Sequence, residues 1–102
     1  MVQTIEIRIS NGIQQTINAL IVYSKNICYI NHTKYHVSDS FIEELLQTIC
    51  MWKPEYGEDD NIDSEEFYIK VTSTDGKESF HGKGIFPHNY SVLKELLGDI
   101  ND

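Results

Sequence analysis

The stretch Thr-Ile-Glu-Ile-Arg-Ile at residues 4–9 decides the fold class, because apolar and polar residues alternate in it without exception. In an extended chain its three isoleucines share one face, while the charged side chains of Glu6 and Arg8 share the other. This pattern is typical of a β-strand with one buried face and one exposed face. The sequence on either side of it continues the same way.

Four dipeptides typical of tight turns separate the short apolar runs: Asn11-Gly12, Lys25-Asn26, Asn31-His32 and Asp75-Gly76. When they are closed as two-residue turns, three of them keep apolar residues on the same face of both strands. The exception is the first, where a two-residue turn would set Ile9 opposite Gln14. We therefore prefer a three-residue bulged loop at residues 10–12, which pairs Ile9 with Ile13 and places Gly12 in the left-handed conformation.

The other three turns define an expected register. Closing them pairs Ile21 with Ile30, Cys28 with Tyr35, and Val71 with Phe80. Residues 4–36 thus predict four antiparallel strands in sequence order, and residues 67–84 predict a second hairpin. A glycine inside the returning strand of that hairpin, Gly82, indicates a bend or a close approach of other atoms.

Two amphipathic helices are predicted. The first begins at Ser40, where Glu43 completes a capping box, and it ends before Pro54. Its apolar stripe consists of Phe41, Ile42, Leu45, Leu46, Ile49 and Trp52. The second is a short helix that follows Pro87 and has Gly98 as its C-cap. Its apolar residues are Val92, Leu93, Leu96 and Leu97.

These elements predict a single α+β domain over residues 1–102, in the order β-β-β-β-α-β-β-α. We expect an antiparallel sheet of five or six strands with both helices packed on one face. That face carries Ile5, Ile7, Ile9, Ile21, Cys28, Ile69 and Val71. The pattern leaves open whether the two hairpin groups share one sheet. Residues 55–66, which are mostly acidic, are expected to form a loop.

Sixteen acidic residues against eight Lys and Arg give a formal net charge of −8. This charge disfavours binding to nucleic acid or to anionic membranes, and it favours attraction to a basic partner. Two cysteines do not make a disulfide framework, the chain opens directly on a strand pattern, and no apolar stretch approaches the ~20 residues of a membrane helix. We therefore expect a cytoplasmic protein with free thiols. Its richness in Ile, Lys and Asn is typical of AT-rich bacterial or phage genomes.

No arrangement of residues matches a known chemical site. An EF-hand-like frame in the acidic loop has Ser64 where the turn needs glycine and Lys70 where calcium needs a bidentate glutamate. Cys28, His32 and His36 have the spacing of zinc ligands on a helix, but they lie in a strand pattern, where residues four apart are separated by ~13 Å. We predict no catalytic, cofactor-binding or metal-ligating residues.

The leading hypothesis is a non-enzymatic module for protein–protein interaction with a basic partner. Aromatic residues at a helix end beside an acidic loop resemble an interface hot spot with a polar rim. The expected surface comprises Trp52, Glu55, Tyr56, Glu58, Asp59, Asp60 and Asp63. For Trp52 the alternative is packing of the helix against the sheet. The small acidic composition is similar to that of bacterial immunity proteins, antitoxin-associated proteins and phage-encoded inhibitors, which implies an inhibitory or regulatory accessory role.

Two further hypotheses belong to other classes of protein. One is a small-molecule or metal-dependent enzyme with a site near Cys28, His36, His81 and His88. The other is a homodimeric structural protein that associates through apolar residues on the opposite face of the sheet, namely Val22, Ile27 and Tyr29. The protein is thus expected to be a monomer or a homodimer.

Overall fold

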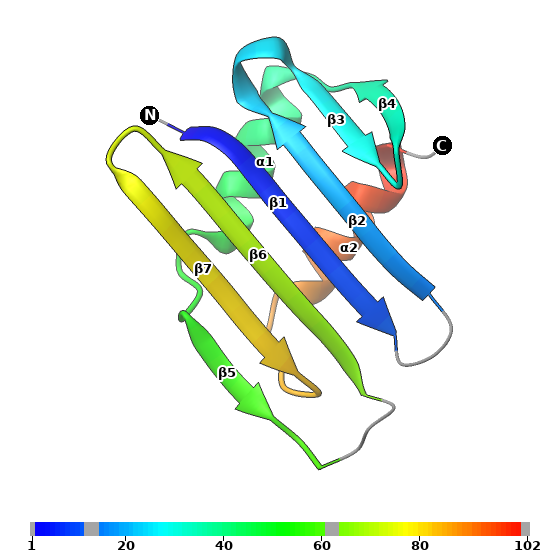
Figure 1. Cartoon of the computed structure of the whole chain (residues 1–102), viewed down its shortest axis with the longest axis vertical. Coiled ribbons are helices and arrows are strands. Elements are labelled where there is room, and N and C mark those ends of the chain that lie inside the picture. The colour runs from blue at the N-terminus through cyan, green and yellow to red at the C-terminus, as the bar shows by residue number, and fades with distance from the viewer. Residues whose placement is uncertain (1, 12–14, 61–63, 101–102) are drawn as a thin grey trace.

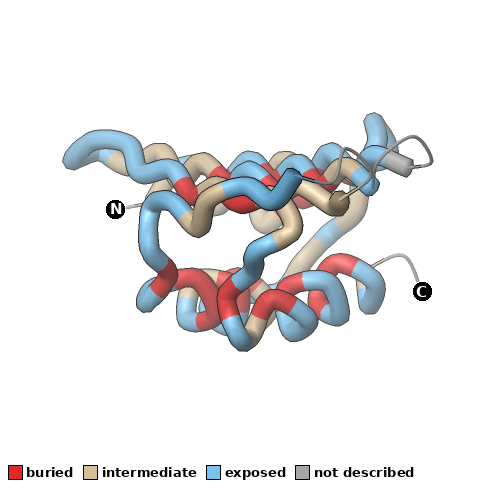
Figure 2. Tube along the Cα trace, turned by 90° about the horizontal axis from the view of Figure 1, so that it is seen from below, coloured by how far each residue is buried: buried red, intermediate tan, exposed pale blue. Residues whose placement is uncertain are grey.

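Strand β1 (Val2–Asn11) contains the alternating isoleucines and lies in the middle of the sheet. It pairs antiparallel with β2 (Gln15–Val22) on one side and with β6 (Glu65–Ser73) on the other, so the two hairpin groups share one sheet. The computed structural model describes residues 2–11, 15–60 and 64–100. These residues form two layers, a sheet and a pair of helices (Figures 1 and 2).

The described residues form a seven-stranded sheet in the order β4-β3-β2-β1-β6-β7-β5. All neighbouring strands are antiparallel except β5 and β7. The remaining elements are η1 (Tyr23–Lys25), β3 (Ile27–Ile30), β4 (Thr33–His36), α1 (Asp39–Ile49), β5 (Glu55–Glu58), β7 (Gly76–Lys83) and α2 (Tyr90–Ile100). The α+β prediction is confirmed, and the observed order is β-β-β-β-α-β-β-β-α.

The additional strand is β5, which lies within the segment that the sequence predicts as a loop. It adds to the edge of the sheet, parallel to β7, with Glu55 beside His81 and Glu58 beside Lys83. The prediction of five or six strands was wrong at this point, because β5 has no alternating apolar pattern. Backbone hydrogen bonds define the strand, and sequence periodicity does not report them.

The first hairpin has a different register from the expected one. Ile9 lies opposite Ile17 rather than Ile13, and Asn11 lies opposite Gln15. Pairing therefore continues through residues that we had assigned to the bulged loop, whose glycine lies outside the described residues. This longer register sets apolar residues opposite one another along the helix-facing side of both strands.

Two other registers also differ from expectation. Ile21 pairs with Cys28, because the 3₁₀ turn η1 and the left-handed Asn26 (φ 52°) take up four residues between β2 and β3. Ile69 pairs with Phe80, because the β6–β7 turn centres on Thr74-Asp75 rather than on residues 75–76. All of the differences are even numbers of residues. Each side chain therefore stays on the face that the sequence predicts.

The turn between β3 and β4 agrees with the prediction. Cys28 lies opposite Tyr35, and the two turn residues, Asn31 and His32, have φ values of 48° and 75°. Positive φ at both central positions is what a two-residue turn of this twist requires.

Both helices cover the predicted face of the sheet, behind it in Figure 1. The N-cap of α1 is Ser38 rather than Ser40, since Ser38 has an extended backbone and its hydroxyl accepts the Phe41 amide at 3.0 Å. Helix α2 continues through Gly98 to Ile100, so Gly98 is not its C-cap. The half-buried Ile100 extends the apolar stripe of α2 by one turn.

One core fills the space between the layers. The isoleucines of β1, Ile21, Cys28 and Ile69 are buried as predicted, and Val71 is partly buried. The helices contribute Ile42, Leu45, Ile49, Leu93, Leu96 and Leu97. Val92, expected in the apolar stripe of the second helix, instead faces solvent with 41% of its surface exposed, and Cys50 at the end of α1 is exposed as well.

Candidate functional site

The acidic segment after α1 is held against the sheet by its backbone. The His81 amide donates to the Pro54 carbonyl at 3.0 Å, and the Asp59 amide donates to the Lys83 carbonyl at 3.0 Å. These bonds fix both ends of β5. The segment therefore brings its carboxylates to a defined place at the edge of the sheet.

His81 lies at the centre of these carboxylates. Its Nδ1 lies 2.9 Å from Oε1 of Glu55, and its Nε2 lies 2.7 Å from Oε2 of Glu66. The hydrogen bonds to Glu66 and to Glu55 raise the pKa of His81, although partial burial opposes them. The bond from His81 in turn lowers the pKa of Glu55. An imidazole with a carboxylate at each nitrogen favours the doubly protonated, cationic form.

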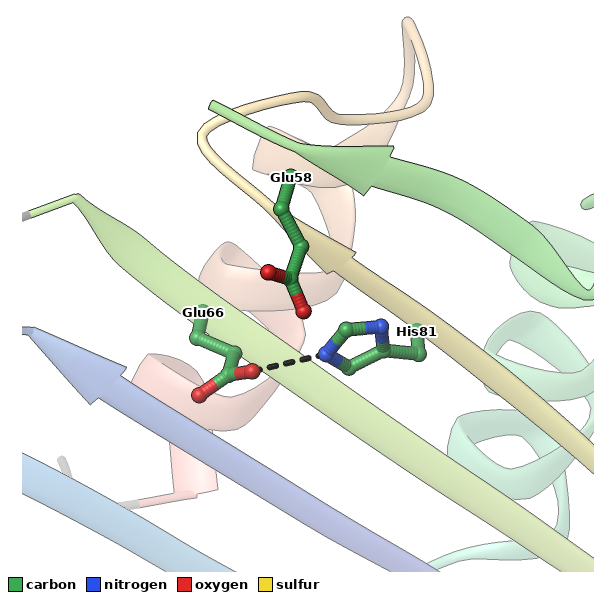
Figure 3. Close-up of side chains that lie close together, drawn as sticks. All are labelled: Glu58, Glu66 and His81. Atoms are coloured by element: carbon green, nitrogen blue, oxygen red, sulfur yellow. Dashed lines mark hydrogen bonds and ion pairs between the residues drawn. The ribbon is translucent and has the colours of Figure 1, made fainter. Parts of the chain in front are cut away.

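A third carboxylate, that of Glu58, lies beside Glu66 and His81 (Figure 3). One ligand atom each from Glu58, Glu66 and His81 lies within 4.8 Å of the other two. We call Glu55, Glu58, Glu66 and His81 together the His81 cluster. Figure 3 shows Glu58, Glu66 and His81 on the face of the sheet turned away from the helices, and β5, β6 and β7 each contribute to the cluster.

Charge in the His81 cluster is not balanced by the nearest lysine. Lys83 is the Cα partner of both Glu58 and Glu66, yet it forms no ion pair with any described residue. The preceding glutamate, Glu65, is different, because Tyr90 donates to it at 2.6 Å and Lys94 pairs with it at 3.1 Å. Three carboxylates around one imidazolium leave the cluster with a net negative charge.

The aromatic residues of the expected binding surface do not lie on it. Trp52 is 7% exposed and packs against Phe67, at 5.6 Å between ring centroids, and against Phe80 and Tyr90. The assignment of Trp52 to a protein-binding surface was therefore wrong, and the packing alternative is correct. Tyr56 is half-buried, and its hydroxyl accepts the Lys53 amide at 2.9 Å.

The acidic residues of that surface are exposed where the structure describes them. Glu55 and Glu58 belong to the His81 cluster, and Asp60 is exposed beyond β5. Asp59 is held in place, since its carboxylate accepts the Ser64 hydroxyl at 2.6 Å and lies directly over Gly84. Asp63 lies outside the described residues.

Glu66 and His81 were missing from the expected surface. The predicted register placed His81 opposite Lys70, whereas the structure places it opposite Tyr68. Glu66 lies two residues before Tyr68 on β6, so its side chain is on the same face of the sheet as that of His81. The parallel pairing of β5 adds Glu55 from a segment expected to be a loop. A correct register for β6 and β7 would have indicated two of the four residues, but sequence periodicity carries no signal for the parallel pair.

The site considered for an enzyme is not assembled. Cys28 is buried in the core on the helix side, and burial raises the pKa of its thiol to about 11. His36 is on β4, five strand positions from His81 on β7, which corresponds to about 24 Å. His88 is exposed in the segment before α2. Of these four residues, only His81 belongs to the His81 cluster defined above.

Two apolar features lie outside the core. Ile85 and Phe86 are 44% and 36% exposed, and Ile85 lies beside Gly57 of β5. A hollow of about 760 Å³ lies on the helix-free face of the sheet and is lined in part by Leu20, Tyr29 and Tyr68. Of the residues considered for a homodimer, Ile27 is buried, Val22 is half-buried and Tyr29 is exposed.

Comparisons with known proteins do not assign this chain to a class. No model of a known protein family matches it, and no curated protein is similar to it. Among the described residues, no helix is both long enough and apolar enough to cross a membrane. Functional conclusions therefore rest on the site itself.

Proposed function

We propose that this protein is a non-enzymatic, cytoplasmic binding module of bacterial or phage origin that recognises a basic protein through the acidic end of its sheet. The observation that carries the proposal is the docking of β5 beside β7. This pairing gathers carboxylates from two distant segments, Glu55 to Asp60 and Glu66, at one edge. A concentration of one sign of charge at one edge attracts a partner of opposite charge.

The surface next to these acids can supply apolar contact area. Ile85 lies against β5, and the exposed ring of Phe86 stacks on Tyr90 with 4.5 Å between centroids. Apolar anchors beside a charged rim are the usual composition of a protein interface. In this proposal Ile85 and Phe86 take the anchoring role that the sequence suggested for Trp52.

Regulation or inhibition of the partner is the role that fits such a module. The formal net charge of −8 disfavours nucleic acid and anionic membranes as alternatives. A catalytic function has less support, since the four residues considered for it are dispersed. A homodimer through the helix-free face is the other alternative, and sedimentation velocity of the isolated protein tests it.

The test uses the partner captured from the native host and then purified. Association rates are measured at low and high salt for the wild type and for the double variant Glu58→Gln/Asp60→Asn. Both side chains are exposed, and neither forms an ion pair with a described residue. The matched control is Glu43→Gln/Glu44→Gln, which removes the same charge from the exposed side of α1.

We expect the acidic-edge variant to associate several-fold more slowly at low salt, with the difference disappearing at high salt, because rim charges act mainly on association rates. The control variant should behave as the wild type does. Equal rates for all three proteins would contradict the proposal. So would an equal loss in both variants, since net charge alone would then explain the effect.

A further inference from the structure

We propose that Glu58, Glu66 and His81 form a binding site for a divalent transition-metal ion of the zinc class, with Glu55 as the residue that positions the imidazole. This inference does not require the proposed protein partner, and the association rates of the acidic-edge variant, which lacks the Glu58 carboxylate, are measured with a chelator present. The inference concerns the isolated chain and is tested on it.

The first argument is the convergence of donors. The three residues come from three different strands, and their ligand atoms all lie within 4.8 Å of one another (Figure 3). In a tetrahedral zinc site with bonds of about 2.0–2.1 Å, the ligand atoms are roughly 3.4 Å apart. The distance between His81 Nε2 and Glu66 Oε2 is 2.7 Å, so these two atoms have to separate by less than about 1 Å to reach that geometry. The torsions of the two glutamate side chains provide the freedom for this shift.

The second argument is the environment of the imidazole. Glu55 is not one of the three converging residues, and its carboxylate lies 2.9 Å from the other ring nitrogen, Nδ1. A metal-bound histidine usually donates its second ring N–H to a carboxylate, which fixes the tautomer and the orientation of the ring. In the neutral ring that binds a metal, Nδ1–H donates to Glu55, and the lone pair of Nε2 is directed toward Glu58 and Glu66.

The third argument is charge. With a neutral imidazole, the carboxylates of Glu55, Glu58 and Glu66 carry three negative charges, and Lys83 does not pair with them. A divalent ion offsets most of this charge at its centre. When the ion binds, Nε2 gives its proton to the solvent, so a metal–nitrogen bond replaces an N–H bond.

The donor set also selects the kind of ion. Calcium and magnesium are coordinated by oxygen ligands, whereas an imidazole nitrogen combined with carboxylates suits zinc and its transition-metal neighbours. Three protein ligands leave at least one coordination position for water or for a group on a partner. A plain acidic loop does not provide this donor set, because it offers no nitrogen ligand.

The test is titration of chelator-treated, full-length protein with Zn²⁺ by isothermal calorimetry. We expect one ion per chain. Glu66→Gln and His81→Gln should each weaken binding at least about tenfold. The matched controls are Glu78→Gln, an exposed glutamate on β7, the strand of His81, and His36→Gln, an exposed histidine on β4. Both controls should bind as the wild type does, and a large excess of Ca²⁺ should not displace the ion.

A second measurement needs no substitution in the site. In a long-range ¹H–¹⁵N spectrum of the wild type, Zn²⁺ should shift Nε2 of His81 and leave the rings of His32, His36 and His88 unchanged. In Glu55→Gln, the Nδ1 resonance of the zinc-bound His81 ring should move while the fold is retained, because the carboxylate that accepts its N–H is lost. Absence of saturable binding would overturn the proposal. Metal-dependent shifts at the other histidines, or wild-type affinity in both site variants, would overturn it as well.

Discussion

The Asn89 side chain links Trp52 to the end of helix α1. Its Oδ1 accepts the indole N–H of Trp52 at 2.7 Å, and its Nδ2 donates to the Thr48 carbonyl at 2.9 Å. Asn89 immediately precedes α2, so one amide group connects both helices to the large aromatic side chain between them and the sheet. Sequence patterns assigned no role to this residue.

Replacing Asn89 by Ala should therefore destabilise the protein. The change leaves the Trp52 N–H and the Thr48 carbonyl without partners in a partly buried place, which costs roughly 1–3 kcal/mol. Urea unfolding followed by Trp52 fluorescence measures the loss. The neighbouring His88→Ala, an exposed position, is the control and should change the free energy of unfolding little. An Asn89→Ala protein as stable as the control would contradict the importance of this bridge.

The contact of His81 with two glutamates makes stability depend on pH. Because folding raises the pKa of His81, its contribution is fully present below the ordinary histidine pKa of about 6.5 and is lost as pH rises through the folded value. Because folding lowers the pKa of Glu55, its contribution is present above the ordinary glutamate value and is lost as pH falls through the folded value. The ion pair thus contributes most between these two limits.

We expect the difference in unfolding free energy between wild type and His81→Gln to be larger at pH 5.5 than at pH 8.5, measured by urea titration with a chelator present. The difference should shrink with added salt, since Glu55 is exposed and Glu66 is only half-buried. His36→Gln removes an exposed imidazole at the other edge of the sheet and provides the reference. A difference for His81→Gln that does not vary with pH would refute the prediction.

Two glycines should respond to alanine in opposite directions. A Cβ on Gly82 would lie 2.5 Å from the Ile85 carbonyl oxygen and 2.7 Å from Phe67 Cε1, so backbone and core have to shift. Gly82→Ala should destabilise the protein by about 1–3 kcal/mol. A Cβ on Gly98 meets nothing within 4 Å, and Gly98 lies inside α2. Gly98→Ala should stabilise the protein by up to about 1 kcal/mol.

Thermal unfolding of both variants measures these two effects. Gly98→Ala is the matched control for Gly82→Ala, since it makes the same chemical change at a site with free space. Destabilisation by both would indicate that glycine flexibility, rather than close packing, matters at position 82.

The two cysteines should differ in reactivity. Cys28 is buried with its pKa raised to about 11, whereas Cys50 is exposed at the end of α1. Because the thiolate is the reactive form, a disulfide reagent at neutral pH should modify one thiol per native chain and both thiols after denaturation. Cys50→Ser should abolish the reaction of the native protein. Fast modification that persists in Cys50→Ser would show that Cys28 is accessible.

Alternation in the first strand was enough to predict the core. Ile5, Ile7 and Ile9 are buried as expected, and the stripe of α1 faces them. Side-chain direction repeats every two residues in a strand and every 3.6 in a helix, so local sequence reports which face is buried. Most of the registers were wrong by even numbers of residues, an error to which alternation is insensitive.

The His81 cluster could not be predicted in the same way. It depends on the edge pairing of β5 with β7 and on the exact partner of His81 across β6. The four residues of β5, two glutamates, a tyrosine and a glycine, carry no apolar periodicity. A parallel edge pairing is formed between backbone groups that every sequence possesses. The acids of residues 55–60 were found from composition, whereas Glu66 and His81 required the three-dimensional register.

The sequence by itself therefore determined the fold class, the two helices and the face of each strand that is buried, because these follow from the local periodicity of apolar residues. Only the tertiary structure decided that β1 joins the two hairpin groups, that β5 completes the sheet, and that an imidazole lies among three carboxylates. Such contacts between distant segments depend on how the backbone pairs over the whole domain, and that pairing leaves no local pattern in the chain.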